Sequence, residues 1–285
     1  MFQFLLYKLG YFLATRLSLK SSYRLAKILS TAQYFFSRTD RNTVKNNLKA
    51  IFPDKSDKEI TKITKQVFIN FGKYLADFLR FSKMDEKIIK SKVKVEGLQY
   101  VDEVLSQGKG IIAITAHLGN WELAGITMGL LGYKIMGVVL AHSDSNVDRF
   151  FNNQRMINNL EVCTLGRAAY FCLAALKENK MIALVADRDF TEHSVVIDFL
   201  NKKAMLPKGP ATFHLKTGAP IIGGFLVRLP DDSFKFTFEK PFIFKLSGEK
   251  EKDIEAITQQ YAQTIEKYIR QYPEQWYMFR KFWIG

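Results

Sequence analysis

The sequence predicts an α/β fold with a mixed, largely parallel sheet flanked by helices, and three observations lead to this prediction. Residues 1–90 carry apolar side chains at helical spacing. From about residue 93, short apolar runs alternate with helix-like segments, which is typical of sheets built by crossover connections. Residues 234–239 alternate apolar and polar side chains, which predicts an edge or antiparallel strand.

Composition is compatible with one large folded unit. The chain has 285 residues, of which 47% are hydrophobic, enough for a substantial core. Its 25% charged residues are close to the globular average, which argues against wholesale disorder. The two cysteines, Cys163 and Cys172, form no C-x-x-C pair and are expected to be core thiols in a reducing compartment.

The N-terminal region combines positive charge with apolar bulk. Residues 1–50 hold nine basic residues and one acidic residue, a large share of the formal net charge of +14. The apolar side chains beside them suit a bilayer interface better than a nucleic-acid arm: Phe2, Phe4, Leu5, Leu6, Leu9, Phe12, Leu13, Leu17 and Leu19. Charges interrupt the stretch too often for a membrane span, and no signal-peptide pattern is expected. We therefore predict membrane-associating helices over residues 1–38 and an α/β domain over 39–285, although an ordinary docking helix remains an alternative for the first segment.

The elements follow in order along the chain. Ser56 with Glu59 has the pattern of a capping box and predicts a helix start. The predicted strands are 93–96, the run ending at 116, 133–139, 181–186, 195–199, 220–227 and 234–239. The predicted later helices are 149–159, 168–178 and 251–272.

The most informative stretch is "IAITAHLGNWELAG", at the junction of a predicted buried strand and a helix. Ligands gather at the carboxyl ends of parallel strands, and His117 lies at such an end. A histidine there can act as a general base if a carboxylate holds its other ring nitrogen. Glu122 is the candidate partner, provided that the turn at Leu118–Asn120 brings the chain back, with Gly119 easing it.

No serine or cysteine nucleophile accompanies this pair. The pattern therefore favours direct attack by a substrate hydroxyl or amine, as in acyl transfer without a covalent intermediate. For an arbitrary string with this spacing, a buried structural histidine and an exposed glutamate are the more common explanation. The surrounding motifs decide between the two.

Those motifs resemble the lipid A biosynthesis acyltransferases, the lauroyl and myristoyl transferases of the lysophospholipid acyltransferase superfamily. The resemblance covers nearly the whole chain and extends to their actinobacterial relatives, the phosphatidylinositol mannoside acyltransferases. It rests on an ordered series of segments: "NTVKNNLKAIFPDKSDKEI" at 42–60, "HLGNWE" at 117–122, "NVDRFFNNQR" at 146–155, "VADRDF" at 185–190, "LPKGPATFHLKTGAPIIGGFLVR" at 206–228 and "YPEQWYMFRKFW" at 272–283. The "LGNW" turn and the short chain depart from the enterobacterial lipid A enzymes, which leaves the acceptor open.

The resemblance implies that His117 is the base and Glu122 its orienting acid. It implies an acyl donor on acyl carrier protein or coenzyme A, a hydroxyl acceptor on a membrane glycolipid, and no cofactor or metal. The partners would be inner-membrane lipids and not nucleic acid. The protein would be a peripheral or monotopic membrane protein at the cytoplasmic face of the cell inner membrane.

Further candidates for substrate binding fall into three groups. Arg149, Arg155 and Arg167 suit phosphate, with surface solvation as the alternative. Asp187, Arg188 and Asp189 follow a predicted strand and match the acidic motif of the family, although a strand-end turn with local salt bridges explains them equally well. Asn120 in the turn and Gly209 in "KGP" resemble the family's acceptor-site motifs, with a plain turn as the alternative for Gly209.

The function predicted from these patterns is transfer of a fatty acyl chain from a thioester to a hydroxyl of a lipid A precursor or a similar glycolipid. A phosphatidylinositol mannoside, a lysophospholipid or an aminolipid remains an alternative acceptor. A non-catalytic basic protein that binds membrane or nucleic acid is the alternative from another class.

Overall fold

The N-terminal third of the protein is helical. The computed structural model describes residues 2–190 and 194–283. Its first helices are α1 (Phe2–Arg16), α2 (Leu19–Phe36), α3 (Arg38–Ile51), α4 (Asp57–Phe78), a 3₁₀ turn (Phe81–Lys83) and α5 (Glu86–Lys92). The predicted capping box is confirmed, because the Ser56 hydroxyl accepts from the Glu59 N–H while the Glu59 carboxylate accepts from the Ser56 N–H.

A seven-stranded, mostly parallel sheet forms the centre, as predicted. Its strands are β1 (Val93–Glu96), β2 (Ile111–Thr115), β3 (Ile135–Val139), β4 (Leu160–Thr164), β5 (Met181–Val185), β8 (Ile221–Arg228) and β9 (Phe234–Phe238), in the spatial order β1-β9-β8-β2-β5-β3-β4. The pair β8–β9 is antiparallel, and the other pairs are parallel. The strands from β8 to β4 therefore end at one common edge of the sheet.

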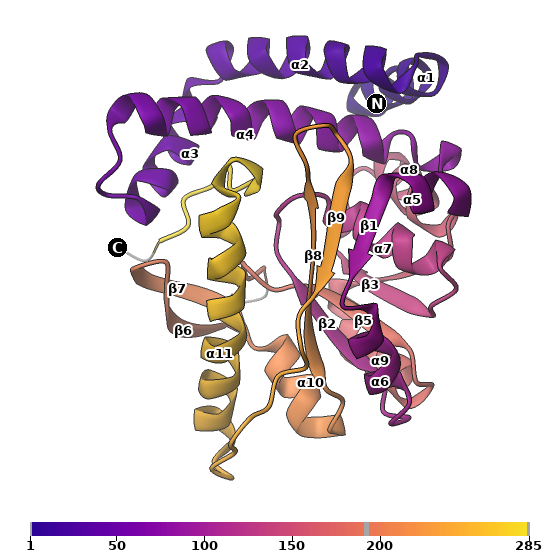
Figure 1. The fold of residues 1–285 in the computed structure, drawn as a ribbon, viewed down its shortest axis with the longest axis vertical. Helices are drawn as coiled ribbons and strands as arrows, with labels where there is room; N and C mark the ends of the chain where they lie inside the picture. The colour runs from indigo at the N-terminus through magenta and orange to yellow at the C-terminus, as the bar shows by residue number, and fades with distance from the viewer. Residues whose placement is uncertain (1, 191–193, 284–285) are drawn as a thin grey trace.

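Helices cover both faces of this sheet (Figure 1). They are α6 (Leu98–Leu105), α7 (Trp121–Leu130), α8 (Ser145–Met156), α9 (Ala168–Lys177), α10 (Gly209–Thr217) and α11 (Lys250–Gln271), with 3₁₀ turns at Leu165–Arg167 and Pro273–Gln275. A separate antiparallel hairpin, β6 (Ser194–Phe199) with β7 (Lys202–Pro207), packs on α11.

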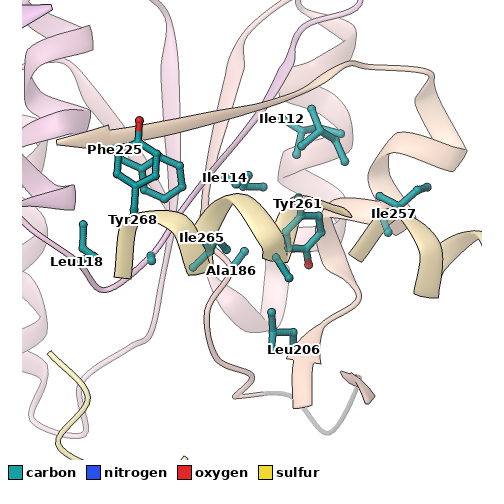
Figure 2. Packing of buried hydrophobic residues seen from close by; sticks show 14 of the residues in the cluster. Ile112, Ile114, Leu118, Ala186, Leu206, Phe225, Ile257, Tyr261, Ile265 and Tyr268 are labelled. Carbon is teal, nitrogen blue, oxygen red and sulfur yellow. The ribbon is translucent and has the colours of Figure 1, made fainter. Parts of the chain in front are cut away.

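Alternation along β2 divides the core between the two faces. Ile112 and Ile114 belong to the core that includes α9, α10 and α11, whereas Ile111 and Ala113 belong to the core that includes α6 and α7. Figure 2 shows α11 in the first of these cores, with Ile257, Tyr261, Ile265 and Tyr268 beside residues of the sheet. Because β2 is buried on both faces, it is a continuous apolar run in the sequence.

Helices α2 and α4 lie side by side across one end of the sheet (Figure 1). This is the carboxyl end of β2 and β8, because Asp77 near the end of α4 binds Asn120, just after β2, and Arg228, the last residue of β8. The N-terminal helices therefore lie over the edge of the sheet that is formed by the carboxyl ends of these strands. Among the residues described, no helix is both long and apolar enough to cross a bilayer.

Four elements were not predicted from the sequence, and one strand has a different place in the sheet. The strands β4 and β7 and the helices α6 and α10 were not predicted. Lys208-Gly209-Pro210 was expected to shape the acceptor site or to form a plain turn, whereas Pro210 stands in the first turn of α10. β9 is antiparallel as predicted but is not an edge strand, because β1 pairs along its outer side.

Candidate active site

The register of the sheet places His117 beside Asp187. In the parallel pair β2–β5, Thr115 lies opposite Val185, and the Ala186 N–H donates to the Thr115 carbonyl. If this register is continued for two residues beyond the end of each strand, His117 lies opposite Asp187. Two segments that are 70 residues apart in sequence thus end side by side.

Asp187 is a fully buried carboxylate that accepts three hydrogen bonds. Its Oδ1 lies 2.7 Å from His117 Nδ1, and its Oδ2 accepts from the His117 backbone N–H at 3.1 Å and from Trp276 Nε1 at 2.9 Å. An ionised aspartate can only accept, so His117 carries its proton on Nδ1 in this contact. The other ring nitrogen, Nε2, is left with its lone pair.

The ionisation states agree with this arrangement. Burial lowers the pKa of His117 below its ordinary 6.5, although the neighbouring Asp187 opposes that shift. Burial by itself would raise the pKa of Asp187, but His117, Arg188 and the Trp276 N–H together lower it. Near neutral pH the pair is therefore a neutral imidazole held by a carboxylate, which is the state a general base requires.

The turn after His117 is held by two neighbouring segments. The C-terminal segment pairs with it, because the Gly119 N–H donates to the Gln275 carbonyl and the Tyr277 N–H donates to the His117 carbonyl, each at 2.9 Å. Gly119 has φ +65°, and a Cβ there would lie 2.0 Å from the Leu226 carbonyl oxygen of β8. Only glycine fits this close approach, so the predicted role of Gly119 in the turn is confirmed.

Glu122 does not contact His117 in the way that the sequence predicted. Both of its carboxylate oxygens bind Arg155 of α8, with Nη2 at 2.6 Å from Oε1 and Nε at 2.9 Å from Oε2. The partner of His117 is Asp187, which reaches it through the sheet, whereas Glu122 lies in the first turn of α7 and points to α8. The predicted His117–Glu122 contact is thus corrected to His117–Asp187 and Glu122–Arg155, and Glu122 acts on the imidazole only as a more distant negative charge.

Asn120 belongs to a second buried cluster close by. Its side chain caps α7 by accepting from the Leu123 N–H, and its amide donates to Asp77 at 3.0 Å. Asp77 also binds Tyr23 of α2 and Arg228 of β8. The position predicted to bind substrate is therefore a buried helix cap that joins the turn to the N-terminal helices.

The remaining predicted residues are distributed more widely. Arg149 is exposed on α8 and borders a hollow with His142 and Asn152. Arg167 is exposed beyond β4, the outer strand, which is three strand spacings of roughly 4.8 Å from β2. Gly209 opens α10, and a Cβ there would meet nothing within 4 Å, so no close approach requires glycine at this position.

Arg188 and Asp189 do lie beside the pair, on the segment that continues from Asp187. Both are partly buried. The guanidinium carbon of Arg188 lies 5.0 Å from the ring centroid of Phe190, whose ring is 6.3 Å from that of His117.

Trp276 and Asp77 were not predicted as site residues, because no local sequence pattern marks either of them. Trp276 is a single residue within "YPEQWYMFRKFW", and it reaches the site only because the C-terminal segment pairs with the turn after β2. Asp77 is an acid inside an otherwise apolar helix end, "YLADFLR", and that isolated buried charge was the one available signal.

A largely parallel α/β sheet with an oriented histidine at its carboxyl edge is typical of an enzyme that uses a general base. Comparison with known proteins makes the class specific: residues 2–284 match the model of the bacterial lipid A biosynthesis acyltransferase family. The chain belongs to this family and is an acyltransferase.

Two kinds of relatives are similar to it. The phosphatidylinositol mannoside acyltransferase of Mycolicibacterium smegmatis is 28% identical over 222 residues, which cover 76% of this chain and 70% of the relative. The lipid A biosynthesis palmitoleoyltransferase of Escherichia coli is 24% identical over 260 residues, covering 90% and 82%. The lipid A biosynthesis acyltransferase of Haemophilus influenzae is 20% identical over 244 residues, covering 84% and 74%. The names of these relatives refer to phosphatidylinositol mannosides in one case and to lipid A biosynthesis in the other two, and the chain itself is a lipid acyltransferase of this family.

Proposed function

We propose that this protein transfers a fatty acyl chain from a thioester of acyl carrier protein or coenzyme A to a hydroxyl group of a membrane glycolipid. The observation that carries the proposal is the contact between His117 Nδ1 and Asp187 at the ends of two adjacent parallel strands. The relatives with assigned acceptors act on lipid A or on a phosphatidylinositol mannoside, which supports a glycolipid as the acceptor class.

In the proposed reaction, His117 Nε2 takes the proton of the acceptor hydroxyl as its oxygen attacks the thioester carbonyl carbon. The carbon–sulfur bond then breaks, and the departing thiolate takes the proton back from the imidazolium. Asp187 keeps the Nδ1–H tautomer in place and stabilises the imidazolium while it exists. The positive end of α7, which begins four residues after His117, favours the negative charge that develops on the carbonyl oxygen.

Glu122 and Arg155 support this geometry in a different way. Their nearly buried ion pair ties the first turn of α7 to α8, so it fixes the helix that follows the catalytic turn. In this proposal the pair positions α7, because both oxygens of Glu122 bind Arg155 and the imidazole binds Asp187 instead.

Helices α1 and α2 are proposed to bind the membrane surface as a peripheral anchor. Exposed apolar side chains project from both helices: Leu5, Leu6, Leu9, Phe12, Ile28, Leu29, Phe35 and Phe36. Exposed cations, including Lys8, Lys20 and Lys27, accompany them and suit anionic headgroups. Because this layer lies over the carboxyl edge of the sheet, the anchor would bring His117 toward the lipids.

The test is mass spectrometry of envelope lipids from cells that produce the wild type, His117→Ala or no protein. We expect one glycolipid to gain the mass of one acyl chain in the wild type only, and the identity of that lipid names the acceptor. Addition of the acyl chain by His117→Ala would contradict the proposed mechanism. A lipid profile that the wild type leaves unchanged, in hosts that make lipid A and in hosts that make phosphatidylinositol mannosides, would contradict the proposed glycolipid acceptor.

A further inference from the structure

Two guanidinium groups lie close to the ring of Phe190, beside the catalytic histidine. The central carbon of Arg188 lies 5.0 Å from the Phe190 ring centroid, and that of Arg280 lies 4.9 Å from the same centroid. The Phe190 ring is itself 6.3 Å from the His117 ring. Arg188 comes from the segment after β5, and Arg280 comes from the C-terminal segment that also supplies Trp276. Both segments are thus fixed by the contacts that build the active site.

Arg188 is partly buried and Arg280 is exposed, and both differ from the two buried arginines near the site. Arg155 binds Glu122 and Arg228 binds Asp77, so each of those charges has a carboxylate. Among the residues that the structure describes, the side chains of Arg188 and Arg280 have no carboxylate within ion-pair distance. Asp189, close to Arg188 in the chain, is engaged in a contact of its own.

Arg188 carries the clearest sign of a missing partner. Its Nε is buried and has no acceptor among the described residues. Burial lowers the pKa of Arg188, Asp187 opposes that shift, and the positive charge of Arg280 lowers the pKa further. A buried donor without an acceptor is unfavourable by about 1–3 kcal/mol, and the nearby positive charge of the exposed Arg280 also disfavours the charged form of Arg188. An anion placed between the two groups would relieve both costs.

We propose that Arg188 and Arg280 bind a phosphate group of the acceptor lipid and thereby position its hydroxyl group at His117. Phosphate suits the pair because each guanidinium presents a planar fork of donors, and the oxygens of one phosphate can accept from both forks. The Phe190 ring holds the two forks in place by cation–π contact. This inference rests on the proposed function, since it assigns a binding site to the acceptor of that reaction.

The position of the pair favours the acceptor over the donor as the source of the phosphate. Arg188 is close enough to His117 for its charge to lower the pKa of the imidazole. A phosphate bound there lies near the reacting atoms. In coenzyme A and in acyl carrier protein, the whole pantetheine arm separates the phosphate from the thioester carbonyl. A compact phosphorylated headgroup can instead bring its phosphate and its hydroxyl to the site together.

The first test is kinetic and uses the purified enzyme with acyl-coenzyme A and the acceptor identified by lipid mass spectrometry. In Arg280→Ala and Arg188→Gln, we expect the KM for the acceptor to rise about tenfold or more, as when a charge-assisted hydrogen bond is lost. The KM for acyl-coenzyme A should stay within about twofold. Arg280→Lys, which keeps the charge but not the fork, should fall between the wild type and Arg280→Ala. The matched control is Arg270→Ala, an exposed arginine on α11 that binds Asn201 and should change neither constant.

A rise in the KM for acyl-coenzyme A alone would assign the phosphate to the donor and overturn the proposal. Unchanged constants in both variants would also overturn it while leaving acyl transfer by the wild type intact. The second test needs no turnover: calorimetric titration with glucosamine 6-phosphate, compared with glucosamine. We expect the wild type to bind only the phosphorylated sugar and both variants to bind it about tenfold more weakly or more. Equal binding of the two sugars by the wild type, or equal binding of the phosphorylated sugar by wild type and variants, would contradict the site.

Discussion

Two fully buried aspartates, Asp187 and Asp77, bind the two ends of the same short turn, and they do different things there. Asp187 binds His117 at the start of the turn, and Asp77 binds Asn120 three residues later. Each accepts three or more hydrogen bonds. By composition and burial the two clusters look alike.

The two clusters differ in whether a polar atom of the bound side chains remains without a hydrogen bond. Around Asp77, the phenol of Tyr23, the guanidinium of Arg228 and the amide of Asn120 bind one another or the carboxylate, so the cluster closes on itself. Around Asp187, the imidazole uses only Nδ1, and Nε2 keeps a lone pair beside Phe190 and Trp121. A buried polar cluster at a strand end thus has a structural role when all its polar side chains are hydrogen-bonded within it. It is a candidate catalytic centre when a reactive atom, such as Nε2 of a histidine, has no hydrogen-bond partner in the cluster.

The largest expected difference between the two clusters is the fall in kcat that Asp187→Asn should cause. The amide cannot fix the Nδ1–H tautomer or stabilise the imidazolium, so kcat should fall roughly 10⁴-fold, as when the aspartate of a Ser-His-Asp triad is replaced by asparagine. Initial rates of acyl transfer measure the effect, and thermal unfolding checks that the variant is folded. A kcat within tenfold of the wild type would remove Asp187 from the mechanism.

Asp77→Asn should instead act on stability. It removes the buried carboxylate that pairs with Arg228 and leaves that arginine only the more exposed Asp232 at 3.4 Å, which should lower the free energy of unfolding by about 3 kcal/mol. The folded fraction should keep a kcat within about tenfold of the wild type, because His117 and Asp187 are untouched. Urea unfolding followed by tryptophan fluorescence gives the first quantity, and rates well below the unfolding midpoint give the second. A large loss of kcat at unchanged stability would make the two clusters functionally equivalent.

The pH dependence sharpens the comparison further. Because the pKa of His117 is held below 6.5, the neutral base predominates at pH 7, and kcat/KM should be level there. As the pH falls through the pKa of His117, the imidazole becomes protonated and kcat/KM should fall about tenfold per pH unit. Asp77→Asn should leave the position of this acid limb unchanged. An acid limb centred above pH 7 would contradict the assigned protonation state.

Trp276→Phe should give the smallest effect. It removes one of three hydrogen bonds to Asp187, a loss of about 1 kcal/mol, so kcat should fall several-fold rather than by orders of magnitude. Steady-state kinetics of the variant, with its unfolding curve, measures this. A loss as large as that of Asp187→Asn would mean that Trp276 acts directly on the substrates.

The comparison also explains which parts of the site the sequence could predict. His117 was predictable because a buried run ends abruptly at a histidine and a helix begins four residues later. Both His117 and Asp187 were placed at strand ends, but the prediction paired His117 with Glu122 because they are close in sequence. Their actual pairing follows from β2 lying next to β5, a crossover that skips β3 and β4 and that no local pattern encodes.

The same limit applies to the rest of the fold. Most strands were predicted from apolar runs and the capped helix α4 from Ser56 and Glu59, because those signals are local. β4 was missed because Glu161 and Thr164 leave no continuous apolar run in Leu160–Thr164, and α10 because its opening Gly209-Pro210 looks like a connecting turn. Trp276 and Arg280 reach the site through the pairing of the C-terminal segment with the turn after β2, which is a tertiary contact.

The central claim, that Asp187 and not Glu122 holds the catalytic imidazole, is tested most directly by ¹⁵N NMR of the His117 ring as a function of pH. The measurement compares the wild type with Asp187→Asn and Glu122→Gln, and His117→Gln assigns the signal. We predict a neutral imidazole at pH 7 with its proton on Nδ1 and a pKa below 6.5. In Asp187→Asn this tautomer should be lost and the pKa should fall further, while Glu122→Gln should change both only slightly. A His117 signal that responds to Glu122→Gln more strongly than to Asp187→Asn would contradict the account.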